Sequence, residues 1–589
     1  MKQLIYLVTI LAQLSSTALL SQDNNLIYAE NGRLYHPGGK EVAMWGVNLQ
    51  PCLSWEYNAL MKGIGIKEDA GVFKKMTDES LDELELLGCK VIRCHLTPGD
   101  FTDDKGNLVE TIYLDALDYM IAETAKHNMY CYIAFINHMG QNNVVPGSFM
   151  NTELGKFDYR ARWILDQQKV EYSKNFITQL LNRKNPYNHT VYKNDSSVAV
   201  WEIMNEPRYY SYEAVKETPY YANFTDWATT NKLENNESNY LKYRKQLVLG
   251  YINDMYQTIR ATGDRHPIAW NCNWNRMIMG HEDVFEAIAE SDVEVTAFCN
   301  YPGQNVVKHP YQSNPEDLTR YDFTEWYQNF YDNKNYYGWV LSEPFKNKAK
   351  IVYEFETFYN QSAYLYPLMA DFLRAMGVQM TAMWQYSMPG YATYRSGSHV
   401  LNLKCTPAKA ASFAVAGKIF ENTPIMQPYH TESINEWETE TYTYSYKNDM
   451  SLYCDDDVYY YSNNVKDSES IKPGALVRNI LGYGSSPIVK YDGTGLYKIM
   501  ISDNQMDIII QPDAIHLKKL WQRYSQSEGP VTRLDDKVKH IIQIDLDGWE
   551  KGKYTLFEFK DGKRTKVGSM ENLKLEITPG SYQIVKNTD

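Results

Sequence analysis

The chain has 589 residues, of which 44% are hydrophobic and 22% are charged, a composition that excludes an intrinsically disordered, collagen-like or coiled-coil protein. Its 59 Lys and Arg against 73 Asp and Glu give a formal net charge of −14, so we exclude nucleic acid and anionic membrane surfaces as partners. Aromatic residues make up 14% of the chain; their rings suit stacking on sugars or bases, and the charge leaves sugars as the better fit.

The first 21 residues have the pattern of a secretory signal. Lys2 precedes an apolar run at residues 4–14, and small residues follow at 15–18, which is the order of the regions in a signal peptide. A buried first helix is the alternative, but the Ser/Thr break and the polar residues 21–25 argue against it. We therefore predict a secreted or periplasmic protein. Because no later stretch reaches 18 apolar residues, we expect no membrane span.

From about residue 40 to residue 422, short apolar runs alternate with amphipathic helical patterns, and we expect one domain over residues 22–422. The runs are continuously apolar, which is typical of strands that are buried on both faces in a parallel sheet covered by helices. Eight strand–helix units of this kind predict an α/β fold, a (β/α)8 TIM barrel that carries catalysis. A doubly wound sheet is the alternative. The runs cover residues 42–48, 90–96, 129–137, 197–205, 266–273, 293–301, 349–355 and 378–386.

The closing helix of the barrel and its longest connections follow from local patterns. Pro407 suits the first position of a helix over residues 407–421, and Thr406 can cap it. The connections after the fourth and sixth strands, residues 207–240 and 302–348, are long and rich in Tyr and Trp. Because the chemistry of a barrel lies on the loops after its strands, we expect part of these rings to line a cleft and part to pack the loops down.

After residue 422 the helical period vanishes, and residues 426–589 have the pattern of short strands separated by turn residues. Asp561-Gly562 between two strand patterns predicts a hairpin. We expect an all-β C-terminal region, β-sandwich-like, of one or two modules. The eight cysteines show no C-x-x-C spacing, which favours small buried hydrophobic residues over metal ligands and leaves a single disulfide open.

The strongest local pattern is W-E-I-M-N-E-P, residues 201–207, at the end of the fourth predicted strand. Proline cannot continue the hydrogen-bond ladder of a strand, so we expect the strand to stop there. Glu206 would then turn into the mouth of the barrel, where barrels present catalytic groups. The alternative is a glutamate that caps the next element.

This run resembles the acid/base motif of the clan A glycoside hydrolases, which include glycoside hydrolase family 5. The resemblance covers about residues 40–422 and implies that Glu354 is the nucleophile, with Arg93 and Tyr301 beside it. Trp384 would lie beneath the sugar. The matching segments are Gly46-Val47-Asn48 on the first strand, Val91-Ile92-Arg93 on the second, Asn300-Tyr301 on the sixth, Glu354-Phe355 on the seventh and Trp384 on the eighth.

Two departures from the family pattern affect the substrate more than the mechanism. The family usually has glycine after the strand-seven Glu-Phe, where this chain has Glu356, and its paired histidine corresponds here to Asn137-His138. Glu356 could be a sugar-binding carboxylate, a carboxylate behind the residues that touch the sugar, or a rival nucleophile. His138 is either a structural histidine or a contact to a sugar hydroxyl. Asn48 also lies at a strand end, and the same two roles are open for it. Glu343 imitates the Glu-Pro pattern but is expected in a loop turn.

Glycoside cleavage requires one protonated and one ionised carboxyl at the same pH. We assign Glu206 as the general acid, then base, and Glu354 as the nucleophile; a merely structural Glu354 is disfavoured by the cost of burying an unpaired carboxylate. Asn205 would hydrogen-bond the 2-hydroxyl of the sugar, while Arg93 and Tyr301 would keep the nucleophile ionised. Carboxyl groups about 5–5.5 Å apart would give retention of configuration.

The sequence therefore predicts a secreted retaining β-glycoside hydrolase that cleaves a polysaccharide or oligosaccharide by double displacement. A non-catalytic carbohydrate-binding protein on a degenerate barrel and a transglycosylase are the alternatives. Carboxylates at two separate strand ends speak against the first of these. The expected partner is a carbohydrate substrate, with no cofactor and no metal ion. The sugar, its linkage, exo or endo action and the oligomeric state stay open.

Overall fold

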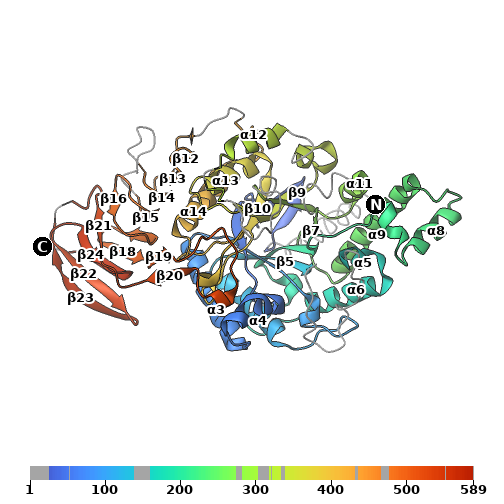
Figure 1. Ribbon diagram of the computed structural model, residues 1–589, viewed down its shortest axis with the longest axis horizontal. Coiled ribbons are helices and arrows are strands. Elements are labelled where there is room, and N and C mark those ends of the chain that lie inside the picture. The colour runs from blue at the N-terminus through green and yellow to red at the C-terminus, as the bar shows by residue number, and fades with distance from the viewer. Residues whose placement is uncertain are drawn as a thin grey trace, which may run out of the picture.

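A computed structural model of the chain describes residues 25–51, 53–137, 159–272, 281–302, 317–319, 321–332, 338–430, 436–465, 477–550 and 552–587. A barrel wrapped by helices forms the larger part, and a set of β-sheets packs against one side of it (Figure 1). The predicted export signal, Cys52 and His138 lie outside the described residues.

Eight parallel strands close into a barrel in the order β10-β3-β4-β5-β6-β7-β8-β9. Nearly every residue in them is buried, because side chains on one face fill the barrel and those on the other meet the helices. Each strand lies within the run predicted for it, so the predicted fold class is confirmed. The strands are β3 (Met44–Asn48), β4 (Val91–His95), β5 (Tyr130–Ile136), β6 (Val198–Met204), β7 (Ile268–Asn271), β8 (Val295–Asn300), β9 (Ala349–Phe355) and β10 (Val378–Met383).

Helices cover the outside of the barrel (Figure 1). The closing helix, α14, begins at Pro407 as predicted, but the predicted cap is wrong: the Thr406 hydroxyl donates to the Asn402 carbonyl (3.0 Å) and makes no cap hydrogen bond. The helices are α2 (Ser54–Glu56), α3 (Ala70–Leu86), α4 (Ile112–Lys126), α5 (Arg162–Leu165), α6 (Gln167–Asn182), α7 (Tyr212–Lys216), α8 (Tyr221–Thr230), α9 (Glu237–Ala261), α11 (Glu282–Glu290), α12 (Thr324–Asp332), α13 (Leu365–Ala375) and α14 (Pro407–Asn422).

The connection after β6, expected as a long loop, folds into α7, α8 and the start of α9. Its aromatic side chains form a small core of their own; the rings of Phe224 and Tyr240, for example, lie 5.3 Å apart edge to face. Aromatic rings at helical spacing bury area without help from the barrel. Packing therefore accounts for the buried rings of this connection.

A hairpin that was not predicted closes the N-terminal end of the barrel. Its strands are β1 (Tyr28–Glu30) and β2 (Arg33–Tyr35). The Leu34 amide donates to Gln379 Oε1 (2.7 Å), and Gln379 Nε2 donates back to the Leu34 carbonyl (2.8 Å). Because Gln379 lies at the start of β10, these two hydrogen bonds hold the hairpin at the end of the barrel opposite to the strand ends that carry Glu206 and Glu354.

The C-terminal region is all β, as predicted. A ten-stranded sheet runs β11-β12-β13-β14-β15-β17-β18-β25-β22-β23, a three-stranded sheet runs β16-β21-β24, and β19 pairs with β20. The predicted hairpin turn joins β22 to β23 through Asp561 (φ 49°) and Gly562 (φ 72°). The strands are β11 (Glu436–Glu438), β12 (Tyr442–Ser445), β13 (Met450–Cys454), β14 (Val458–Ser462), β15 (Asn479–Tyr483), β16 (Val489–Tyr491), β17 (Tyr497–Ile501), β18 (Gln505–Ile510), β19 (Asp513–His516), β20 (Thr532–Asp535), β21 (His540–Ile544), β22 (Tyr554–Lys560), β23 (Lys563–Met570), β24 (Lys574–Ile577) and β25 (Gly580–Lys586).

Both faces of the ten-stranded sheet are covered along β14. Along β14, Val458 and Tyr460 belong to the core that the sheet shares with the barrel, whereas Tyr459 and Tyr461 belong to a second core that contains Ile542 of the three-stranded sheet. This alternation is the two-residue period of a strand. The region is therefore a sandwich whose inner face is continuous with the core of the barrel.

The described cysteines are buried, in agreement with their predicted role as small hydrophobic side chains. Within the residue ranges given above, the helices are all too short or too polar to cross a bilayer.

Candidate active site

Two nearly buried glutamates lie at the C-terminal ends of two barrel strands. Glu206 follows β6 and is 7% exposed, and Glu354 is in β9 and is 5% exposed. The backbone of Glu206 is left-handed (φ 46°), a conformation that costs a non-glycine residue about 1–3 kcal/mol and persists only where its surroundings impose it. Pro207 follows directly, and the backbone N–H of Asn205 donates to the Ile136 carbonyl (2.8 Å). This turn directs the Glu206 carboxyl into the barrel mouth.

A β-bulge aims two consecutive side chains of β9 inward. Phe298 pairs with Val352 and Cys299 with Glu354, so Tyr353 has no counterpart on β8. An extra residue of this kind redirects the side chains of a strand. The Tyr353 hydroxyl donates to Glu206 Oε1 (3.1 Å), which places β9 and the turn after β6 in direct contact.

The side chains predicted around Glu354 are brought together by the barrel. Arg93 Nη1 donates to Glu354 Oε1 (3.2 Å), and the Tyr301 hydroxyl donates to Glu354 Oε2 (2.8 Å). Each carboxylate oxygen therefore has a strong donor, and Arg93 is 0% exposed. Donors of this kind favour the ionised carboxylate.

The guanidinium of Arg93 also holds the remaining polar groups of the site. Nη1 donates to Asn48 Oδ1 (2.9 Å), and Nη2 donates to Asn205 Oδ1 (2.8 Å) and to Glu202 Oε1 (2.8 Å). The amide of Asn48 bonds backbone carbonyls of β9 and β10 (3.0 and 3.1 Å). Asn48 and Asn205 are thus fixed on either side of the same cation.

Burial and the side chains that donate hydrogen bonds to Glu354 shift its pKa in opposite directions. Burial raises its pKa to about 8, and the negative charge of Glu206 adds to that rise, while Arg93 and Tyr301 oppose it. The two carboxyl groups titrate as a pair. Acid-assisted displacement needs one proton and one negative charge on the two carboxyl groups.

The two other candidate glutamates lie elsewhere. Glu356 is 0% exposed, and its Oε1 accepts from Lys409 Nζ of α14 (2.7 Å) and from the Tyr366 hydroxyl of α13 (3.1 Å). Burial raises its pKa, and Lys409 opposes that rise. Glu356 is therefore a buried ion-pair partner in the helical layer. Glu343 is exposed in a short 3-10 turn beside Lys346, as predicted.

Trp384 lies just beyond the end of β10, where the sugar platform is predicted. It is half-buried. The ring of Trp55 lies nearly parallel to it, with centroids 6.4 Å apart, and His95 meets it edge to face at 4.9 Å. Two indoles with one orientation at a barrel mouth suit stacking on the apolar faces of sugar rings.

Sequence reasoning missed two residues that accompany the predicted ones. Glu202 is fully buried and accepts from Arg93 and from Asn271 Nδ2 (3.0 Å). Tyr353 reaches Glu206 as described. Both carried a usable signal, because Glu202 lies inside W-E-I-M-N-E-P and Tyr353 directly precedes Glu354.

Two further residues come from irregular segments in which no pattern marks them. Arg160 Nη1 lies 3.5 Å from Glu206 Oε2 and forms an ion pair with it. The ring of His399 packs edge to face against Tyr301 at 5.6 Å, and burial holds its pKa well below the usual value. Among the described residues, no group of three or more His, Cys, Asp or Glu could hold a metal ion.

Comparison with known proteins finds no matching family model. Mannan endo-1,4-beta-mannosidase 5 of Arabidopsis thaliana is 30% identical over 107 residues, which is 18% of this chain and 24% of that protein. Mannan endo-1,4-beta-mannosidase 2 of Arabidopsis thaliana is 31% identical over 97 residues, 16% of this chain and 22% of that protein. The chain thus spans about a quarter of the length of the curated relatives it matches. These relatives confirm the predicted resemblance to the clan A glycoside hydrolases.

Solved structures with a similar chain include a glycoside hydrolase family 5 mannosidase from Rhizomucor miehei, at 13% identity and a TM-score of 0.47 over 68% of this chain and all of that one. An endo-beta-1,4-mannanase from Thermotoga petrophila is 13% identical with a TM-score of 0.44, over 92% of this chain and 98% of that one.

Proposed function

We propose that the protein is a retaining glycoside hydrolase that cleaves a β-1,4-linked mannan within its chain. The observation that carries the proposal is the pair Glu206 and Glu354, which reach one barrel mouth from β6 and β9, where the charge of Glu206 raises the pKa of Glu354. The curated relatives are named as mannan endo-1,4-beta-mannosidases, and they supply the substrate and the endo mode of the proposal.

In the proposed first step, Glu354 attacks the anomeric carbon while Glu206 gives its proton to the leaving oxygen. The product is a covalent glycosyl–enzyme ester. In the second step Glu206, now ionised, takes a proton from water, and the water oxygen displaces Glu354 from the anomeric carbon. Two displacements on one carbon restore its configuration, so the β-anomer is released.

The neighbours of the pair support this division of roles. Arg93 and Tyr301 stabilise negative charge on Glu354, the nucleophile. Asn205 is held by Arg93 next to the acid/base glutamate, in a position suited to the 2-hydroxyl of the sugar. Trp384 supplies the stacking surface. Glu356 has no part in the proposed displacement, because its carboxylate is paired with Lys409.

We also propose that the protein is exported. This proposal is supported by the N-terminal pattern of Lys2, an apolar run and small residues. A polysaccharide substrate fits that destination, because it is too large to enter a cell.

The test replaces each glutamate in turn and measures hydrolysis of soluble mannan and of an aryl β-mannobioside. Glu206→Gln should lower turnover of mannan by about 10²–10⁴-fold, the usual contribution of a general acid, and Glu354→Gln should abolish it. The matched control is Glu343→Gln, which changes an exposed glutamate and should leave turnover unchanged. Mannan hydrolysis that survives Glu354→Gln would remove the assignment, and product release without net retention would remove the mechanism.

Azide separates the two roles. In Glu354→Ala, azide can take the place of the nucleophile in a single displacement and should give the α-mannosyl azide. In Glu206→Ala, azide should attack the glycosyl–enzyme and give the β-anomer. A transglycosylase would give longer oligosaccharides in place of reducing ends, and a binding protein would give no product from the wild-type chain.

A further inference from the structure

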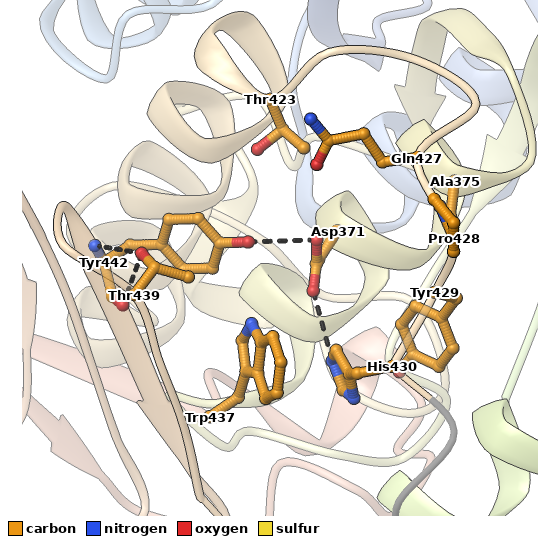
Figure 2. Close-up of a pocket in the computed structure, with 10 residues that line it drawn as sticks. All are labelled: Asp371, Ala375, Thr423, Gln427, Pro428, Tyr429, His430, Trp437, Thr439 and Tyr442. Atoms are coloured by element: carbon orange, nitrogen blue, oxygen red, sulfur yellow. Dashed lines mark hydrogen bonds and ion pairs between the residues drawn. The ribbon is translucent and has the colours of Figure 1, made fainter.

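A second cavity lies outside the barrel, between α13, the segment at residues 423–430, and the strands β11 and β12 (Figure 2). Its volume is about 560 Å³, within the range of small-molecule sites in proteins. Glu206 and Glu354 are inside the barrel, whereas this cavity lies against the outer surface of a barrel helix. It is therefore separate from the candidate active site.

A buried carboxylate forms the polar centre of the cavity. Asp371 Oδ1 accepts from the Tyr442 hydroxyl (3.0 Å), and Oδ2 accepts from the Tyr444 hydroxyl (3.1 Å) and lies 3.2 Å from His430 Nε2. Asp371 is 9% exposed. In Figure 2 the side chains of Asp371, Tyr442, His430 and Trp437 point toward a common space. Three partners fix the carboxylate, and Oδ1 keeps a lone pair that a ligand hydroxyl can use.

Aromatic rings form one wall of the same cavity. The ring of His430 stacks on Trp437, with centroids 3.9 Å apart and planes 20° apart, and Tyr429 lies 4.2 Å from His430 on its other side. Trp437 is half-buried. Because the stack is held before any ligand arrives, binding there costs little side-chain entropy. A rigid, half-exposed indole beside polar groups suits the face of a sugar ring.

The charge of the residues that line the cavity distinguishes between anionic and neutral ligands. Among the described residues that line the cavity there is no Lys or Arg, and Asp371 supplies a negative charge. Glu436 and Glu438, both exposed, precede and follow Trp437 on β11, but they line a pocket on the other face of the strand. Anionic ligands are therefore disfavoured. Thr439 and Gln427 add a hydroxyl and an amide, groups that both donate to and accept from neutral hydroxyls.

We propose that this cavity binds a neutral saccharide unit of the polymer that the barrel cleaves. The proposal rests on the proposed function for the identity of the polymer, but it does not depend on catalysis. A second contact of this kind holds the enzyme on its substrate and raises the effective concentration of nearby chains at the active site.

The test is a calorimetric titration of the full chain carrying Glu354→Gln with β-1,4-mannohexaose, with α-1,4-maltohexaose as the comparison sugar. Two classes of mannohexaose site are expected in this background. Adding Trp437→Ala should weaken one class by about tenfold or more and leave the other unchanged. Gln427→Trp, at an exposed position on the rim, should fill the cavity and remove the same class without disturbing Asp371. The matched control is Trp227→Ala, a half-exposed Trp of α8 at the far end of the barrel (Figure 1).

Hydrolysis gives a second readout in the chain with Glu354 intact. Trp437→Ala should keep kcat/KM on the soluble aryl β-mannobioside within about twofold and lower the initial rate on insoluble mannan by about tenfold. A single class of site in the Glu354→Gln parent, or two classes that persist in both Trp437→Ala and Gln427→Trp, overturns this proposal while the proposed function stands. Mannan hydrolysis that survives Glu354→Gln overturns the proposed function, and the titration still decides whether the second site exists.

Discussion

Replacement of Arg93 by Met tests whether the charge of the guanidinium sets the pKa of Glu354. The guanidinium is 0% exposed and is the cation of both Glu202 (2.8 Å) and Glu354 (3.2 Å). It also lies between the rings of Tyr132 and Tyr353, 5.1 and 5.0 Å from their centroids, where methionine would keep much of the packing. The substitution therefore removes the charge with a small change in volume.

The magnitude follows from the removed charge. An opposite charge at this distance lowers a carboxyl pKa by about 1–3 units, so its loss should raise the pKa of Glu354 from about 8 to about 9–11. Since only the singly protonated pair can act, both limbs of the plot of kcat/KM against pH should move upward by about 1–3 units. The assay is kcat/KM on the aryl β-mannobioside from pH 4 to pH 11, with far-UV circular dichroism at each pH.

Two companion variants keep this test decisive. Arg93→Met leaves Glu202 buried without a cation, which should cost about 3–5 kcal/mol of unfolding free energy. Arg93→Met with Glu202→Gln removes that charge and should regain stability while keeping the shifted pH limbs. Arg93→Lys keeps the charge and should keep the limbs in place. Unshifted limbs in a folded Arg93→Met variant would refute the assigned role of the guanidinium.

Two further predictions follow from buried carboxylates. In the wild-type protein, the pair of Glu206 and Glu354 should lose its last proton near pH 8. Below that pH the leaving group can be protonated and above it no acid remains, so kcat/KM should fall on the alkaline side with an apparent pKa of about 8. A profile of kcat/KM that is flat to pH 10 would contradict this prediction. Lys409→Met should lower the unfolding free energy, measured in urea, by about 3–5 kcal/mol, because Glu356 is left buried and unpaired. The double variant Lys409→Met with Glu356→Gln should recover part of that loss. A change below about 1 kcal/mol for the single variant would show that the protein does not need the ion pair.

The barrel was predictable because its strands are buried on both faces and so appear as continuous apolar runs. The ends of those runs place Glu206 and Glu354, and the structure brings Arg93 and Tyr301 to Glu354. Asn205 and Asn48 bond to Arg93. These contacts depend only on which strand end each residue occupies, and that is encoded locally.

The contacts that could not be predicted depend on partners distant in the chain. Glu356 lies two residues after Glu354, but its ion pair is made with Lys409, 53 residues later on α14. The inward turn of Tyr353 depends on a bulge that is defined only against β8. Thr406 has a favourable capping position, yet a hydrogen bond to Asn402 competes successfully for its hydroxyl.

The union of α14 with the C-terminal sheet has a consequence for any attempt to shorten this protein. The helix packs on β3 on one side and on β13 to β15 on the other, and the Ser462 hydroxyl donates to the Ala408 carbonyl (2.6 Å). The Gly397 amide, in the loop after β10, donates to the Leu520 carbonyl (2.6 Å). A truncation after Asn422 would expose the outer surface of the last helix and remove a contact of the loop after β10 at the same time, so the barrel and the sheet must be expressed and engineered as one body.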